Sequence, residues 1–200
     1  MTPPRERKAP APSRERIVAG AADMISRRGL SATSIREMAK HAKAPLGSTY
    51  HYFPEGKQQL ATEAVRYTGE WVSRRLRQEL EAGPVEGLRA FLSLWRKIVV
   101  DSDFHAGCPV LAVAIEEPQT DEIPPPLEAA AEVFTEWENL LATSLRTHGT
   151  PPAQAAQLAT LVLAAVEGTV ALCRARRTIQ PLDDTAHQLE ELIANAVRNP

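Results

Sequence analysis

TSIREMAKHAKAPLGSTYHYFPEGK, residues 33–57, is the stretch that decides the fold of this 200-residue chain. Its first half carries Ile35, Met38 and Ala42 at helical spacing, so one face of the segment is apolar. A turn of about four residues follows, and a second short helix is predicted over residues 46–52. Two short helices packed across such a turn describe a helix-turn-helix, which places its second helix in the major groove of DNA.

The second predicted helix carries small and hydrogen-bonding side chains. Gly47 and Ser48 add little bulk, which lets a helix enter a groove about 12 Å wide. The hydroxyl of Tyr50 and the imidazole of His51 suit phosphates or base edges at the rim of that groove. Taken singly, each residue has an ordinary alternative role as a core or surface side chain. The prediction of DNA binding therefore rests on the whole spacing.

The remaining sequence is helical in pattern, with no β-alternation and no Asn-Gly hairpin signal. Ser13 is the expected N-cap of a first helix that Gly29 ends, and Thr33 or Ser34 caps the next helix. Amphipathic or apolar segments broken by proline and glycine then follow residue 57. The sequence predicts an all-α fold of nine helices, three short ones in front and six behind; the six are expected near residues 57–80, 85–99, 107–118, 127–145, 151–176 and 182–197.

Charge is distributed unevenly along the chain. Residues 1–60 hold 11 Lys/Arg against 5 Asp/Glu, whereas residues 61–200 hold 12 against 20. A basic head on an acidic body suggests that the head meets a polyanion. We expect a flexible arm over 1–12, a helix-turn-helix DNA-binding domain over 13–56, and a ligand-binding and dimerisation domain over 57–200.

The segment around the second helix resembles the TetR family of repressors, whose recognition segment runs Gly-x-x-x-Gly-x-x-Tyr-x-x-Phe-x-x-Lys. This chain supplies Gly47, Tyr50 and Phe53, and then Lys57, which stands one residue late. That insertion and the run GCPVLAVAIE resemble the LmrA/YxaF-like branch of the family. The resemblance implies a TetR-like fold and a homodimer that binds a palindromic operator and releases it when a small, largely apolar effector binds.

The resemblance also implies residue roles in DNA binding. The chain departs from the family pattern at Lys43, where the turn usually has glycine, and at Leu46, where lysine is frequent. Lys43 adds charge to the turn, and Leu46 replaces a phosphate contact by an apolar one. The residues expected to cap the supporting helix, approach bases or clamp the DNA backbone are Thr33, Ser34, Lys43, Leu46, Gly47, Ser48, Thr49, Tyr50, His51 and Lys57.

The segment 154–173 is apolar around too much of its circumference to face water. A partner subunit is the simplest cover, and with the last helix this segment can build a four-helix bundle across a twofold axis. The alternative is the central helix of a monomer core. The side chains expected at the dimer interface are Val162, Ala165, Val166, Leu189 and Ile193.

Aromatic residues gather in the body, which is typical of an apolar ligand pocket with a few polar groups. Each of them can equally be plain core, and an empty pocket and a solid core look alike in a sequence. Glu167 has a rival role as a solvent-facing or interfacial acid. The candidate ligand-binding residues are Phe91, Trp95, Phe104, Cys108, Leu111, Phe134, Trp137, Glu167 and Thr169.

Several function classes are disfavoured. No Gly-rich phosphate loop, Ser/His/Asp signature or metal-ligand spacing is evident, so we expect no enzyme, cofactor or metal site. The two cysteines form no C-x-x-C pair, and no signal-peptide core or run of about 20 apolar residues is present. A cytoplasmic protein without a membrane partner is expected. A DNA-binding regulator without an effector, or an all-α interaction module, remain alternatives, as does activation rather than repression.

Overall fold

A computed structural model describes residues 14–118 and 122–198 of the chain. Within those ranges the chain forms nine α-helices and no strand, as the sequence predicts. The arm expected over residues 1–12 and the cap expected at Ser13 lie outside the described residues.

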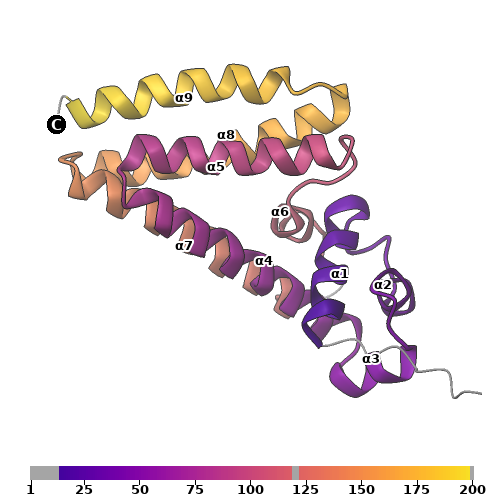
Figure 1. The fold of residues 1–200 in the computed structure, drawn as a ribbon. Helices are drawn as coiled ribbons and strands as arrows, with labels where there is room; N and C mark the ends of the chain where they lie inside the picture. The colour runs from indigo at the N-terminus through magenta and orange to yellow at the C-terminus, as the bar shows by residue number, and fades with distance from the viewer. Residues whose placement is uncertain (1–13, 119–121, 199–200) are drawn as a thin grey trace, which may run out of the picture.

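The helices form a small head and a larger body (Figure 1). The head contains α1 (Arg14–Arg28), α2 (Ile35–His41) and α3 (Leu46–Tyr52). In the body, α4 and α7 lie side by side, and α6 lies between the body and α1. The body helices are α4 (Lys57–Leu80), α5 (Pro84–Asp101), α6 (Pro109–Ala114), α7 (Pro125–Thr147), α8 (Pro152–Arg176) and α9 (Gln180–Arg198).

Proline and glycine set most of the helix boundaries. Helices α5, α6, α7 and α8 each carry proline in their first turn, where its missing N–H costs no hydrogen bond. Helix α1 ends before Gly29, whose φ of 78° is easily adopted only by glycine, and the Gly29 N–H donates to the Ile25 carbonyl at 2.8 Å. The sequence-predicted end of the first helix is thus confirmed.

Aromatic side chains fill the body core. Trp95 and Trp137 are fully buried with ring centroids 6.4 Å apart, and Phe91 packs edge-on against both. The Trp137 indole N–H donates to the carbonyl of Gly69 at 3.4 Å. Because a Cβ on Gly69 would lie 2.4 Å from a methyl of Val133, this glycine lets α4 and α7 approach closely.

Hydrogen bonds from α6 and its neighbours join the head to the body. The Gly107 N–H donates to the Ser26 carbonyl at 3.0 Å, and the carboxylate of Glu116 accepts the Ser31 N–H at 2.8 Å. The guanidinium of Arg174, near the end of α8, donates to the Arg27 carbonyl at 3.0 Å. The end of α1 is therefore held by both α6 and α8.

Helix α8 is long and apolar enough, by length and composition alone, to cross a membrane. Half of the most apolar 18-residue stretch of this helix is buried inside the protein, as in the core helix of a helical bundle. The helix lies beside α7 and α9 in the body (Figure 1), so packing accounts for much of its apolar character.

Candidate DNA interface and body cleft

Helix α2 begins with a capping box. The Ser34 hydroxyl accepts the Glu37 N–H at 3.2 Å, and the Glu37 carboxylate accepts the Ser34 N–H at 2.9 Å. The Ser34 hydroxyl also donates to the Glu37 carboxylate at 2.7 Å, and this bond, together with the one from the Ser34 N–H, lowers the pKa of Glu37. Ser34 is exposed, so its place at the N-terminus of the supporting helix is compatible with the expected phosphate contact.

The turn between α2 and α3 keeps its geometry although it has lysine in place of glycine. Lys43 adopts φ of 52°, in the left-handed region that favours glycine. Its N–H donates to the Lys40 carbonyl at 3.0 Å, and the Ala44 N–H donates to the Ala39 carbonyl at 2.8 Å. This pair of bonds is a Schellman motif, so the substitution strains the backbone without opening the turn.

Helix α3 presents one exposed face. Gly47, Tyr50 and His51 are exposed, and the Tyr50 side chain keeps 49% of its surface open to solvent. Leu46 and Ser48 are partly buried. The helix spans Leu46–Tyr52, the bounds that the sequence predicts. The exposed face therefore carries a residue without a side chain, Gly47, near its start and the hydrogen-bonding side chains of Tyr50 and His51 near its end.

Two expected DNA contacts face the interior instead. Thr49 is fully buried, and its hydroxyl donates to the Pro45 carbonyl at 3.2 Å. Thr33 is 4% exposed, and its hydroxyl donates to the Leu30 carbonyl at 2.9 Å. Both hydroxyls satisfy local carbonyls, so neither side chain is placed to reach a base or a phosphate. We correct the expected contact set accordingly.

Gly47 has no packing reason to be glycine. A Cβ added there would meet no atom within 4 Å among the described residues, and the backbone has no left-handed φ. Glycine inside a helix costs roughly 0.5–1 kcal/mol relative to alanine. The head therefore carries, on the exposed face of α3, a residue that the packing of the described residues does not require.

Lys57 stands at the first position of α4, as expected, and is partly buried. The preceding Gly56 has φ of 75°, and its N–H donates to the Phe53 carbonyl at 2.9 Å. The inserted residue is thus taken up in a turn that only glycine closes without strain. Phe53 itself is fully buried beneath the guanidinium of Arg14, which lies 5.1 Å from the ring centroid.

Helix α2 carries two exposed basic side chains that are absent from the predicted DNA contacts. Arg36 lies in the first turn of that helix and Lys40 in the last. Their positions relative to Ser34, within a basic head, were the available signal. We add both to the residues that can meet phosphates.

A cleft of about 360 Å³ lies between α6, α7 and α8. Leu111, Phe134 and Glu167, three of the nine expected ligand residues, line it. An adjoining cavity against the end of α1 is lined by Cys108, a fourth expected ligand residue, and again by Leu111. Each of the three helices that form the cleft thus contributes one lining residue that the sequence had singled out.

The other expected ligand residues lie elsewhere. Phe91, Trp95 and Trp137 pack into one another in the core, so the plain-core alternative describes them. Phe104 lies in the turn after α5, where its N–H donates to the Val99 carbonyl at 2.8 Å. The hydroxyl of Thr169 lies 3.1 Å from that of Thr185 on α9 and is therefore used within the fold.

Glu167 is the unusual member of the cleft. Its side chain is 4% exposed, and neither carboxylate oxygen has a hydrogen-bond partner among the described residues. Burial raises the pKa of Glu167 to about 7, and only the nearby thiol of Cys108, a weak donor, opposes that rise. Burial also raises the pKa of Cys108 well above its ordinary value, and Glu167 adds to the effect.

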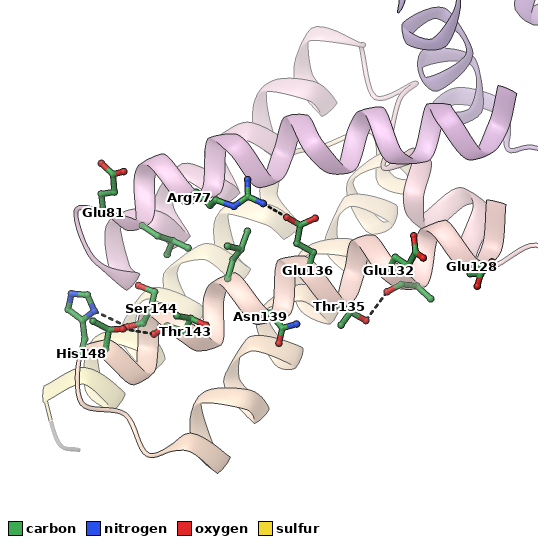
Figure 2. A pocket seen from close by; sticks show the side chains of 14 residues that line it. Arg77, Glu81, Glu128, Glu132, Thr135, Glu136, Asn139, Thr143, Ser144 and His148 are labelled. Atoms are coloured by element: carbon green, nitrogen blue, oxygen red, sulfur yellow. Dashed lines mark hydrogen bonds and ion pairs between the residues drawn. The ribbon is translucent and has the colours of Figure 1, made fainter. Parts of the chain in front are cut away.

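A groove of about 890 Å³ lies along α4 and α7 (Figure 2). Its charged and polar groups are largely satisfied locally: Arg77 pairs with Glu136, and the His148 ring donates from Nδ1 to the Ser144 carbonyl at 2.8 Å. None of the expected ligand residues lines this groove. It is an open, acidic surface rather than an enclosed site.

Most of the residues expected at the dimer interface are buried inside the chain. Val162, Val166, Leu189 and Ile193 are buried against the chain's own helices, and Ala165 is partly buried. A partner subunit cannot reach the four buried side chains in this arrangement. The open face of α8 lies on its other side, where Leu161 is 47% and Leu172 45% exposed. Ala164 and Gly168 are exposed between these two leucines.

An all-α body with a basic, three-helix head that presents a short exposed helix is the architecture of helix-turn-helix DNA-binding regulators. The sequence model of the tetR family of bacterial regulatory proteins matches residues 17–64. The model for the C-terminal domain of LmrA/YxaF-like transcriptional regulators matches residues 84–188. The chain belongs to the TetR family of transcriptional regulators and to its LmrA/YxaF-like branch.

Relatives and solved structures agree with this assignment. The chain is 42% identical to an uncharacterized HTH-type transcriptional regulator of Mycobacterium tuberculosis, over 90% of this chain and 93% of that protein. It is 33% identical to the HTH-type transcriptional regulator LmrA of Bacillus subtilis, over 85% and 90% of the two chains. These relatives are regulators rather than enzymes, as the sequence predicts for this chain.

Two solved structures share the fold. A TetR transcriptional regulator from Legionella pneumophila superposes with a TM-score of 0.80 at 19% identity, over 90% of this chain and 96% of that one. A TetR transcriptional regulator from Chloroflexus aurantiacus superposes with a TM-score of 0.73 at 32% identity, over 90% and 93%. The predicted TetR-like fold is confirmed.

Proposed function

We propose that this chain is a transcriptional repressor that binds a palindromic operator as a homodimer and leaves it when a small, largely apolar effector binds. The exposed face of α3 would enter the major groove. Gly47 carries the proposal: its missing side chain serves no contact within the described residues, whereas close approach to DNA needs that space. Tyr50 and His51, both exposed, would reach the groove rim or the backbone.

The supporting contacts come from the ends of neighbouring helices. Ser34 at the start of α2 and Lys57 at the start of α4 place N–H groups and an ammonium where phosphates would pass. Lys43, Arg36 and Lys40 add exposed positive charge to the same head. Contacts of this kind fix orientation on the duplex, and they make the affinity fall with salt.

The homodimer would form through the exposed face of α8. Leu161, Ala164, Gly168 and Leu172 follow one another at helical spacing on that face. Among the described residues no atom lies within 4 Å of a Cβ added to Gly168, which lies where this face borders the cleft between α6, α7 and α8. Close packing of α8 on a second α8 would use this glycine, and would present two heads to one duplex.

Helix α6 would transmit the effect of a bound effector from the cleft to the DNA-binding head. One end of this helix is near the cleft, where Cys108 caps it by accepting the Leu111 N–H at 3.4 Å. Just past its other end, Glu116 binds Ser31 in the head. A molecule that fills the cleft and displaces α6 would move α1 and alter the spacing of the two heads, a shift away from the DNA-competent population.

A gel shift against the region upstream of the chain's own gene, repeated across a salt series, tests this proposal. We expect a dimer on one palindromic site, with affinity that falls steeply as salt rises. A protein that stays monomeric, or DNA binding that does not depend on salt, would favour the all-α interaction module. DNA binding that no cleft ligand changes would favour a regulator without an effector.

A further inference from the structure

Glu167 lies in an apolar wall. Of the described residues that line the cleft, Leu111, Leu163 and Phe134 supply hydrocarbon, and the two charged groups are Glu167 and Glu138. No lysine or arginine is among them. A buried carboxyl without a hydrogen bond destabilises the folded protein unless some other group pairs with it.

The other residues that the structure describes do not supply that group. The nearest candidate, the Cys108 thiol, is a weak donor. The adjoining cavity contains three arginines, but each has another partner: Arg174 donates to the Arg27 and His105 carbonyls, Arg27 pairs with Asp23, and Arg28 lies 3.9 Å from Glu37. An anionic ligand would have to share those cations and would repel Glu167.

We propose that the cleft between α6, α7 and α8 binds a lipophilic cation, an aromatic or aliphatic amine whose ammonium pairs with Glu167 and whose apolar part packs on Leu111 and Phe134. This inference rests on the proposed effector function and gives its ligand class. A cation is favoured over a neutral alcohol because only a cation cancels the charge of a carboxylate held away from water. The cleft volume of about 360 Å³ suits a small ligand.

The raised pKa of Glu167 predicts a proton change on binding. Glu167 has a pKa near 7, so near neutral pH a fraction of the molecules carries a protonated carboxyl. An ammonium stabilises the ionised form, and binding therefore releases the carboxyl proton to the buffer. A neutral alcohol has no such requirement, which separates the two ligand classes by a measurement on the wild-type protein alone.

The test uses matched ligand sets in isothermal titration calorimetry on the full chain. The sets are 2-phenylethylamine, 2-phenylethanol and phenylacetate, then tryptamine, tryptophol and indole-3-acetate, and then the three naphthyl analogues. We expect the amine to bind about tenfold or more tightly than the alcohol in at least one set. Titrations in two buffers of different ionisation enthalpy should show proton release near pH 7. A best ligand that is an alcohol or a carboxylate, or no detectable amine binding, overturns the proposal.

Two variants locate the binding. Glu167→Gln, which resembles the neutral acid in shape, should lose the amine preference and the proton release. Glu128→Gln, an exposed acid in the α4–α7 groove, should keep both. A preference that survives Glu167→Gln, or that only Glu128→Gln removes, places the amine outside the cleft and contradicts the proposal. If Glu167→Gln does not fold, the proton release of the wild-type protein still decides the matter.

The same samples separate this inference from the proposed function. An alcohol that releases the operator DNA would leave the repressor proposal standing while the cation proposal falls. An amine that binds through Glu167 without changing operator affinity would uphold the site and contradict effector release.

Discussion

The Glu116 carboxylate, just past α6, accepts the backbone N–H of Ser31 at 2.8 Å and also the Ser31 hydroxyl. The first residue belongs to the body and the second to the turn between α1 and α2. This contact joins the side of the molecule that holds the cleft to the head that would bind DNA.

Removal of the Glu116 carboxylate should loosen that joint. In Glu116→Ala we expect faster amide hydrogen exchange at Ser31 and a loss of about 1 kcal/mol in the free energy of unfolding, since the group is partly exposed. Glu117→Ala, which removes an exposed neighbouring carboxylate, is the control. Equal exchange at Ser31 in all three proteins would show that the contact does not hold the head.

Lys43 should be a site of stored backbone strain. Lys43→Gly removes the cost of a left-handed lysine, about 1 kcal/mol, and should raise the midpoint of urea unfolding. Lys43→Ala keeps the strain and removes only the charge, so its midpoint should stay near that of the wild type. If alanine stabilises the protein as much as glycine does, charge and not conformation is responsible.

Glu167 should make stability fall as pH rises. Its pKa is about 7 in the folded protein, against an ordinary value of 4.5, because burial disfavours the charged form. Between these values the unfolded chain has lost a proton that the folded chain keeps. The stabilisation is therefore complete below pH 4.5 and is lost towards pH 7, by an amount on the order of 3 kcal/mol.

Urea unfolding from pH 4.5 to 8 measures this slope. Glu167→Gln should abolish it, and Glu128→Gln should retain it. The neighbouring titratable groups are Cys108, whose pKa is raised beyond this window, and the partly buried Glu138. An unchanged slope in Glu167→Gln would assign the proton to a different group.

The open face of α8 should control the oligomeric state. Leu172→Glu places a charge among the exposed apolar residues of that face and should shift a dimer to a monomer in sedimentation experiments. Val100→Glu changes an equally exposed residue on α5 and should leave the dimer intact. A dimer that tolerates Leu172→Glu but not Val100→Glu would place the interface on α5.

The sequence predicted the head well because its signals are local. Pro45 precedes α3 and Pro54 lies just beyond it, so the bounds of that helix follow from two residues. The inward turn of Thr49 could not be predicted, since a seven-residue helix has too few turns to show an apolar period. Thr33 and Ser34 were equal candidates for the cap, and only the Glu37 contact distinguishes them.

Helix α8 shows why the contacts of the body were harder to predict from the sequence than those of the head. Its apolar residues surround the helix, so the sequence contains no period that tells the core face from the partner face. Val162 and Val166 were assigned to a partner but pack inside the chain, whereas Leu161 and Leu172 are open. Glu167, a single acid in an apolar run, was ambiguous until the fold placed it in the cleft without a partner.

The operator affinity of Gly47→Leu, measured together with its thermal stability, tests the central claim most directly. The account predicts an unchanged or higher melting temperature, because the added side chain meets open space among the described residues, and a loss of about tenfold or more in DNA affinity, because it blocks entry of α3 into the groove. A folded Gly47→Leu protein that binds the operator as tightly as the wild type would contradict the claim that α3 reads DNA.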